Sequence, residues 1–231
     1  YDQDILTGTA EEDTQFLLGT LSAFDLITAK ITSLEITPAM LALDPCSGSI
    51  VITDPETGFV KACVSYPGYD NTRLANNMDV DYYNSVNNDL STPFYNKATQ
   101  QSVAPGSTYK PIMAAAGLNE GLIDRDSEVE CYGLFGPGLV PESDYVECWL
   151  RGGHGMEDVV EALGDSCNVF FCTVGYLLGL DDTGGFTLSK ALSKEHRYSS
   201  YFGLDKKSGV QIPETEPQVS DSLPIPSAMG Q

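Results

Sequence analysis

The sequence predicts a mixed α/β fold from two kinds of pattern. The segment "GSIVITDPETGFVKACVSYP" holds two β-rich runs, 49–53 and 59–65, on either side of a turn that contains proline and glycine. Apolar residues at helical spacing follow in three later segments, 107–121, 156–163 and 169–178. Glycine ends the first segment and directly follows the third, as is typical of helix C-termini.

The regions around these elements carry weaker signals. Residues 1–45 mix acidic and apolar positions, and we interpret them as a lead-in or the remnant of another domain. The main domain is expected to run from 46 to 231. Within it, the Asn- and Tyr-rich stretch 67–103 favours loops and short helices. The stretch 124–155, rich in glycine, proline and acidic residues, is expected to form loops.

Composition and charge exclude several classes of protein. Hydrophobic residues make up 42% of the 231 residues, which is enough for a sizeable core. The formal net charge of −21 argues against nucleic acid as a partner, because phosphate binding needs clustered lysine and arginine. No apolar run reaches the ~18 to 20 residues of a membrane span, and the first residues lack the positive start of a signal peptide. An exporting or anchoring segment is therefore expected to lie outside this sequence.

The stretch "APGSTYKP" places a serine three residues before a lysine, just after a Pro-Gly break. Positions i and i+3 share a helix face, so Ser107 and Lys110 can present a hydroxyl and an amine to the same volume. Pro111 is tolerated only near a helix N-terminus, so the helix is expected to begin near Ser107. Unpaired N–H groups and the positive dipole end there favour developing negative charge. The pair is a candidate nucleophile beside a candidate base.

The polar tetrapeptide "DSCN" lies between the second and third helical segments. A polar stretch wedged between two apolar helices must cap one of them or line a cleft. Taken alone, its Ser-x-Asn pattern and the Ser-x-x-Lys pattern are both weak signals. A serine that only caps a helix, beside a solvated lysine, would explain the latter as well.

Three segments together closely resemble the transpeptidase domain of penicillin-binding proteins. They are "NKATQQSVAPGSTYKP", the hairpin followed by "SYPGYDNTRLAN", and "GHGMEDVVEALGDSCNVFF". The ordered resemblance runs from about 48 to 231 and includes "YFGLDKKSGVQIPE" and "PSAMGQ". It implies an α/β fold of the α+β type, with a mainly antiparallel sheet flanked by helices and a helical subdomain, as in serine β-lactamases. The active site would lie between the sheet edge and that subdomain.

The resemblance also implies roles for individual residues. Ser107 would attack the carbonyl of the penultimate D-alanine of a peptidoglycan stem peptide and form an acyl-enzyme. Lys110 would be the base, provided that desolvation keeps it neutral. Ser166 would relay a proton to the leaving amine or to a β-lactam nitrogen, and Asn168 would hydrogen-bond Lys110 and the substrate amide. Cys167 would point into the core, and the Ser107 N–H would form half of an oxyanion hole.

The sequence departs from the family at the third motif, Lys-Thr/Ser-Gly, which normally follows the "GQ" at which this sequence stops. Lys207-Ser208-Gly209 fits that pattern literally. It lies, however, in "FGLDKKSGVQIPE", which the family has upstream of the true motif and outside the active site. We therefore expect the domain to be incomplete at its C-terminus, with the missing strand in a continuation beyond Gln231 or on a second chain.

The six cysteines show no C-x-x-C pair. Cys131 and Cys148 bracket a loop and are compatible with either a disulfide or two free thiols. A zinc site formed by these two and His154 is disfavoured, because no fourth ligand is evident and the spacing fits no zinc motif. No cofactor and no metal are therefore predicted. Trp149 is interpreted as a packing residue rather than as a wall of a substrate groove.

The predicted function is that of a penicillin-binding D,D-transpeptidase that cross-links peptidoglycan and is acylated by β-lactams. The enzymatic alternative is a serine β-lactamase or β-lactam sensor, which differs in how fast the acyl group is released. A non-catalytic scaffold of a cell-wall assembly is the alternative from another class. Expected partners are D-Ala-D-Ala stem peptides, β-lactam antibiotics and cell-wall assembly proteins. The expected location is the extracytoplasmic face of the bacterial cytoplasmic membrane, with an N-terminal anchor outside this sequence.

Overall fold

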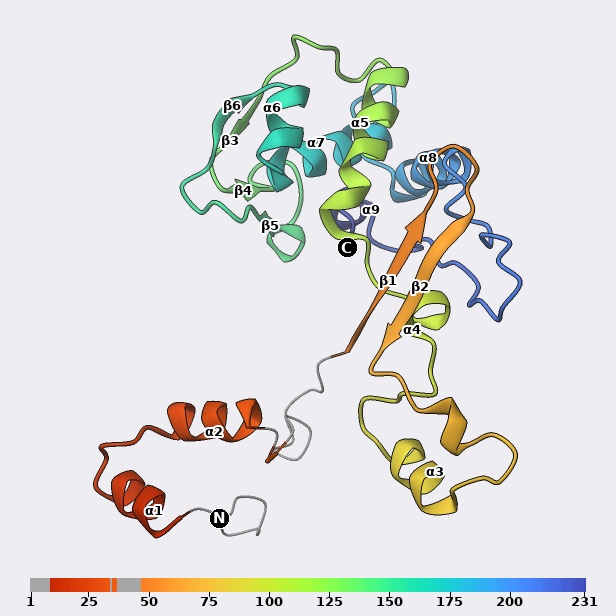
Figure 1. Cartoon of the computed structure of the whole chain (residues 1–231). Coiled ribbons are helices and arrows are strands. Elements are labelled where there is room, and N and C mark those ends of the chain that lie inside the picture. Colours follow the sequence, from red (N-terminus) through yellow and green to blue (C-terminus); the bar gives the residue numbers. More distant parts are fainter. Residues whose placement is uncertain (1–8, 34, 37–46) are drawn as a thin grey trace. The chain divides into compact units, whose positions relative to one another are not determined.

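The computed structural model describes residues 9–33, 35–36 and 47–231. It divides into two compact units, 1–101 and 102–231, and each is described by itself (Figure 1). Every strand pair in the described residues is antiparallel, and helices accompany the strands, so the predicted α/β class is confirmed. Among these residues, no helix combines the length and the hydrophobicity that crossing a membrane requires.

Two capped helices lie in the predicted lead-in. The first, α1 (Ala10–Leu17), begins at Thr9, whose hydroxyl accepts from the Glu12 N–H while the Glu12 carboxylate accepts from the Thr9 N–H. The second, α2 (Ala23–Thr32), begins at Ser22, whose hydroxyl accepts from a backbone N–H in the first turn. Capping side chains, rather than apolar periodicity, mark the starts of both helices. The two helices were therefore not predicted from the sequence.

The predicted hairpin is confirmed. Strand β1 (Gly48–Thr53) pairs antiparallel with β2 (Val60–Tyr66), with one register irregularity near the turn. At the turn, the Asp54 carboxylate accepts from the N–H groups of Glu56 and Thr57, each at 3.0 Å. The expected short helices follow in the same unit: η2 (Asn71–Arg73), α3 (Val80–Asn87) and α4 (Lys97–Gln100).

The second unit combines helices with short strands. Its elements are η3 (Gly106–Tyr109), α5 (Lys110–Asn119), β3 (Val129–Cys131), β4 (Leu134–Phe135), η4 (Glu142–Asp144), β5 (Val146–Glu147), β6 (Gly155–Glu157), α6 (Val159–Gly164), α7 (Asn168–Gly179), α8 (Leu188–Tyr201) and α9 (Pro224–Ser227). Strand β3 pairs with β6, and β4 pairs with β5. Strands β3, β4 and β5 contact α7, and the helices α5, α8 and α9 also pack on α7.

Helix α7 forms the centre of this unit. Five of its side chains have no exposed surface: Phe170, Phe171, Cys172, Val174 and Leu178. A helix that is apolar on most of its circumference must be surrounded by other elements. Burial of each large apolar side chain stabilises the fold by roughly 1.5–3 kcal/mol. The segment predicted as the third helix is therefore the one that fixes the positions of the others.

Of three predicted boundaries, one holds with a different helix type and two were wrong. The helix expected from Ser107 starts as a 3-10 turn, and the α-helix begins only at Lys110, with proline in its first turn. Met156 lies in β6 rather than in a helix, because Asp158 caps α6 through a capping box with Glu161. The stretch expected to be loops contains the short strands β3 to β6, which are too short to show an alternating pattern.

Helix α8 carries an acidic side chain into the core. Glu195 is 2% exposed, and its Oε1 has no hydrogen-bond partner among the described residues. Burial raises the pKa of Glu195 from 4.5 to about 9. The folded state therefore holds a proton that the unfolded state releases. The stability contribution is complete below pH 4.5 and is lost as the pH rises toward 9, at about 1.4 kcal/mol for each pH unit.

We predict that Glu195→Gln stabilises the protein at pH 7.5 by on the order of 2 kcal/mol, because glutamine needs no proton to remain neutral. The gain should shrink at pH 5 and grow toward pH 8. Thermal unfolding across this range checks the prediction, with the exposed Glu142→Gln as a control for removing one carboxylate. A constant gain from pH 5 to 8 would contradict a buried, protonated Glu195.

Candidate active site

Ser107 lies in a tight turn held by a distant backbone segment. The preceding Gly106 has a φ of 61°, and its N–H donates to the Gly230 carbonyl at 2.9 Å. A Cβ atom at position 230 would lie 1.9 Å from the Gly106 carbonyl oxygen, so only glycine fits there. Ser107 occupies the first turn of η3, where helix N–H groups have no intrahelical partner. Its backbone N–H is thus suited to bind a developing oxyanion.

Lys110 extends from the start of α5 into a buried space. The residue is 1% exposed, and its Nζ donates to three acceptors, the Ser166 carbonyl at 2.6 Å, the Ser166 Oγ at 3.0 Å and the Asn168 Oδ1 at 2.8 Å. Three acceptors match the three N–H bonds of an ammonium group. Burial nevertheless lowers the pKa of Lys110 below its ordinary value, because it removes water from the charged form.

The acceptors of Lys110 come from one short segment, the Ser166 turn (165–168), between α6 and α7. Ser166 has a φ of 54°, a left-handed conformation that costs a non-glycine residue roughly 1–2 kcal/mol. This conformation lets the Ser166 carbonyl and hydroxyl both accept from Lys110. Asn168, the first residue of α7, offers its Oδ1 to Lys110 while its Nδ2 donates to the Glu147 carbonyl at 3.2 Å.

The structure links Ser107 to Lys110 through a third side chain. Ser166 Oγ donates to Ser107 Oγ at 2.8 Å and accepts from Lys110 Nζ at 3.0 Å. Ser107 and Lys110 both contact Ser166, and the hydrogen bonds between them run through it. With the bond from Lys110 to Asn168, all four predicted residues meet in one hydrogen-bonded group. Such a group can pass a proton from one hydroxyl to the amine.

The literal Lys-Ser-Gly sequence lies elsewhere, in a loop after α8. Lys207 pairs with Glu216 at 2.6 Å, and the Ser208 N–H donates to the Glu214 carboxylate at 3.0 Å. No strand includes these residues. Their contacts hold the loop together, which agrees with an interpretation outside the active site.

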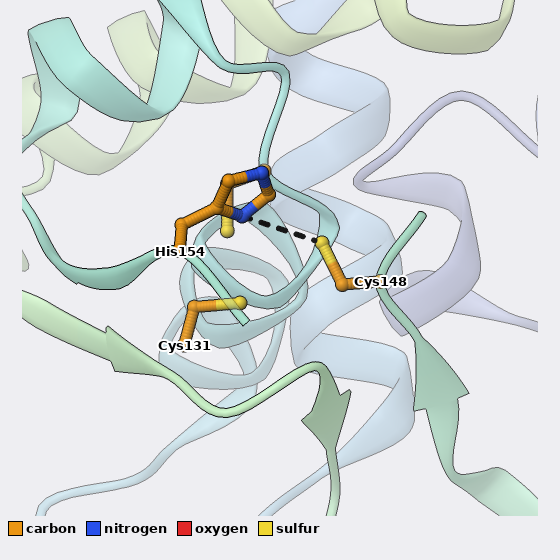
Figure 2. A group of neighbouring side chains, drawn as sticks. Cys131, Cys148 and His154 are labelled. Atoms are coloured by element: carbon orange, nitrogen blue, oxygen red, sulfur yellow. Dashed lines mark hydrogen bonds between the residues drawn. The ribbon is translucent and has the colours of Figure 1, made fainter. Parts of the chain in front are cut away.

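A second group of side chains meets behind the Ser166 turn. The ligand atoms of Cys131, Cys148, His154 and Cys167 all lie within 4.8 Å of one another, and we call these residues the metal-ligand cluster (Figure 2). His154 Nδ1 lies 3.7 Å from Cys148 Sγ. The fourth ligand is Cys167, which the sequence assigns to the core and which the structure also buries there. Cys131 and Cys148 are free thiols.

The donor set of the metal-ligand cluster fits zinc. Three sulfur atoms and one imidazole nitrogen match the Cys₃His donor set that tetrahedral structural zinc sites use. Backbone N–H donors, among them that of Asn168, lower the pKa of the Cys148 thiol even though burial opposes this. Two buried side chains at the cluster also lack hydrogen-bond partners in the described structure, at His154 Nε2 and at both carboxylate oxygens of Glu157. A zinc ion would link strand β3 to the Ser166 turn.

The fold and the site define a class, that of mixed α/β domains in which a serine lies three residues before a buried lysine, in a Ser-x-x-Lys motif. Residues 48–229 match the family described as Penicillin binding protein transpeptidase domain. The chain belongs to this family, and the resemblance noted in the sequence is confirmed.

Three relatives place the chain more closely. Peptidoglycan D,D-transpeptidase MrdA of Escherichia coli K12 is 36% identical over 160 residues, which cover 68% of this chain and 24% of the relative. A Pseudomonas aeruginosa PBP2 structure in complex with WCK 5153 has a TM-score of 0.68 at 25% identity and covers 80% of this chain and 42% of that one. A penicillin G acyl-enzyme complex of penicillin-binding protein A from M. tuberculosis has a TM-score of 0.62 at 25% identity, covering 81% and 42%. The chain thus spans about a quarter of the length of the curated E. coli relative.

We predict that Asn168→Ala destabilises the second unit by about 1–3 kcal/mol, because it leaves the buried Lys110 amine with one acceptor fewer. Denaturant unfolding at pH 7 measures the change. The exposed Asn87→Ala in α3 is the matched control and should change the free energy of unfolding by less than about 0.5 kcal/mol. Equal stability of the two variants would show that the Asn168 contact contributes nothing.

Proposed function

We propose that this domain is the acyl-transfer part of a peptidoglycan D,D-transpeptidase, and that β-lactams acylate Ser107. The observation that carries the proposal is the hydrogen-bonded chain from Ser107 through Ser166 to Lys110. The family and the printed names of the relatives support the same substrate class. The substrates are stem peptides that end in D-Ala-D-Ala.

The first half-reaction moves one proton and exchanges one amide for an ester. Ser107 Oγ attacks the carbonyl carbon of the penultimate D-alanine, and its proton passes to Ser166 while the Ser166 proton passes to a neutral Lys110 amine. The oxyanion is stabilised by the Ser107 N–H, and a donor of this kind contributes on the order of 10² to 10³ in rate. The proton then returns along the same path to the nitrogen of the departing D-alanine as the C–N bond breaks.

The second half-reaction repeats these transfers in the opposite sense. The amine of a neighbouring stem peptide attacks the ester, loses a proton to the same chain of groups, and releases Ser107 with its hydroxyl restored. A β-lactam enters the first half-reaction in place of the peptide, but its leaving nitrogen stays tethered to the acyl group. Slow release of this acyl group separates a transpeptidase from a β-lactamase.

The setting of the reaction follows from the substrate. We propose that the domain works at the extracytoplasmic face of the bacterial cytoplasmic membrane, with cell-wall assembly proteins as partners. The chain's net charge of −21 supports the exclusion of nucleic acid.

We predict that Ser107→Ala abolishes covalent labelling by benzylpenicillin, because the substitution removes the hydroxyl that is proposed to attack the β-lactam carbonyl. Intact-protein mass spectrometry of the full-length protein, followed by mapping of the adduct, measures this. Ser102→Ala, which removes a serine hydroxyl five residues away, is the matched control and should keep the adduct. Persistent labelling of Ser107→Ala would refute the nucleophile, and rapid loss of the adduct from the wild type would favour a β-lactamase.

We predict that the limiting acylation rate rises with pH as Lys110 loses its proton. The midpoint of this rise should lie below pH 10.5, the ordinary pKa of a lysine side chain. Asn168→Asp places a negative charge beside Lys110 and should move the rise to higher pH by about one unit or more. The other ionisable groups that act on Lys110 are Cys148, Cys167, Cys172 and Glu157. Stopped-flow acylation from pH 6 to 10 gives both profiles, and coincident profiles would remove Lys110 from the role of base.

A further inference from the structure

Tyr109 lies between Ser107 and Lys110 in the chain, but its side chain reaches another part of the structure. Ser107 and Lys110 both contact Ser166. The Tyr109 hydroxyl instead forms a hydrogen bond at 2.8 Å with Ser199 Oγ, on α8. Tyr109 is 8% exposed and Ser199 is 5% exposed, so this bond is buried. The segment that carries the nucleophile is therefore attached to a helix outside the hydrogen-bonded group around Lys110.

The Tyr109 hydroxyl is not placed to act as an acid or a base in the reaction. Among the described residues, it is hydrogen-bonded to Ser199 alone. Burial raises the pKa of Tyr109 above 10.0, its ordinary value, so the phenol keeps its proton at neutral pH. An uncharged phenol that contacts α8 can hold the chain in place, but it does not move the proton of Ser107.

The Ser107 turn, which we define as residues 106–110, is attached to the rest of the unit at both ends. At its start, the Gly106 N–H donates to the Gly230 carbonyl at 2.9 Å. Near its end, the hydroxyl of Tyr109 is held by α8. A hydrogen bond inside the turn, from the N–H of its last residue to the carbonyl of Ser107, joins the segment between these attachments into one unit. A rotation at Tyr109 therefore moves the nucleophile.

Helix α8 is a fixed point of attachment because it is also joined to the other end of α5. The Tyr198 hydroxyl accepts from Asn119 Nδ2 at 2.6 Å and donates to the Glu120 carboxylate at 2.9 Å. Lys194 forms an ion pair with the same carboxylate at 2.8 Å. Helix α7 packs on α8 as well. Helix α8 therefore cannot slide along α5 without breaking these contacts, and it holds Tyr109 at a set position.

The hydrogen bond supplies a constraint that packing of the Tyr109 ring does not. Apolar contacts are non-directional, whereas a hydrogen bond weakens steeply as its angle becomes less favourable. Both hydroxyls are buried, so breaking the bond would deprive two polar groups of the partner that the structure gives them. The bond therefore restricts rotation of the Ser107 turn. The 2.8 Å contact between Ser107 Oγ and Ser166 Oγ depends on that rotation.

We propose that Tyr109 and Ser199 are positioning residues for acylation, and that the hydrogen bond between them holds the Ser107 turn at the rotation that places Ser107 Oγ against Ser166. Loss of the bond lets the turn rotate and breaks the first step of the proton path. A displacement of about 1 Å at a reacting group can cost on the order of 10²-fold in rate. The proposal rests on the proposed function, because acylation of Ser107 is the reaction that the positioning serves.

The test uses three variants of the full-length protein and one matched control. Tyr109→Phe and Ser199→Ala each remove one hydroxyl of the bond, and the third variant combines the two changes. The control is Tyr198→Phe, which also removes a buried tyrosine hydroxyl between α8 and α5, but at the other end of α5. Stopped-flow labelling with a fluorescent penicillin separates the limiting acylation rate from the half-saturating concentration. Hydrogen exchange at 106–110 reports the order of the turn, and denaturant unfolding reports stability.

Each single variant should lower the limiting acylation rate by about fivefold or more, with faster hydrogen exchange at 106–110. The half-saturating concentration should change by less than about twofold, because the bond affects the reacting hydroxyl and not the binding of the antibiotic. The double variant should be no more than about twofold slower than the slower single variant, since both changes remove the same bond. Tyr198→Phe should lose comparable stability and keep the wild-type rate and exchange.

Single variants that are acylated within about fivefold of the wild-type rate would overturn the proposal. A rate lowered as far in Tyr198→Phe as in Tyr109→Phe would also overturn it, because a general loss of stability would then suffice. Effects of the single changes that multiply in the double variant would show that the two hydroxyls act independently, which contradicts a role for their bond. Unfolding of both single variants under assay conditions would overturn the proposal too, because the bond would then support the fold as a whole.

These outcomes are separate from the test of the proposed function. If the wild type forms no adduct on Ser107 at all, the proposed function fails whatever the variants do. If the wild type and the variants form the adduct equally fast, only the positioning role of Tyr109 and Ser199 fails.

Discussion

Only 1% of Lys110 is exposed to solvent, so its amine is buried. This burial is the constraint on which the site depends. A buried amine without acceptors would cost several kcal/mol, so the fold must supply them. It does so from a single turn 56 residues further along the chain. The same contacts place the Ser166 hydroxyl between the lysine and Ser107. The contacts that position the lysine are therefore the same contacts that connect it to Ser107.

Much of the fold could be predicted because its signals are local. The hairpin has β-rich runs around a turn, and α7 is apolar on most of its surface. The two lead-in helices and the strands β3 to β6 were missed for a common reason. They are short, and they are stabilised by helix caps or by pairing with distant residues. Neither kind of contact leaves a periodic pattern in the sequence. Pairing between Val129 and Glu157 has no signature in either segment alone.

The candidate site was predicted in its members but not in its connections. The i, i+3 spacing predicted that Ser107 and Lys110 reach the same volume, yet spacing cannot show that a third hydroxyl joins them. The metal-ligand cluster was predicted only in part, because a site of Cys131, Cys148 and His154 was disfavoured for want of a fourth ligand and Cys167 was assigned to the core. A buried cysteine can be a core residue, a metal ligand or both, and only the positions of its neighbours show which.

The hydrogen bond from Gly106 to Gly230 has a consequence for how the protein is made. The serine turn obtains this backbone partner from a segment more than a hundred residues later in the chain. A ribosome adding roughly 5–20 residues per second needs on the order of ten seconds to cover that distance. During synthesis, the turn around Ser107 therefore exists before its support does. The turn around Ser107 should reach its folded arrangement only after the segment that contains Gly230 has emerged.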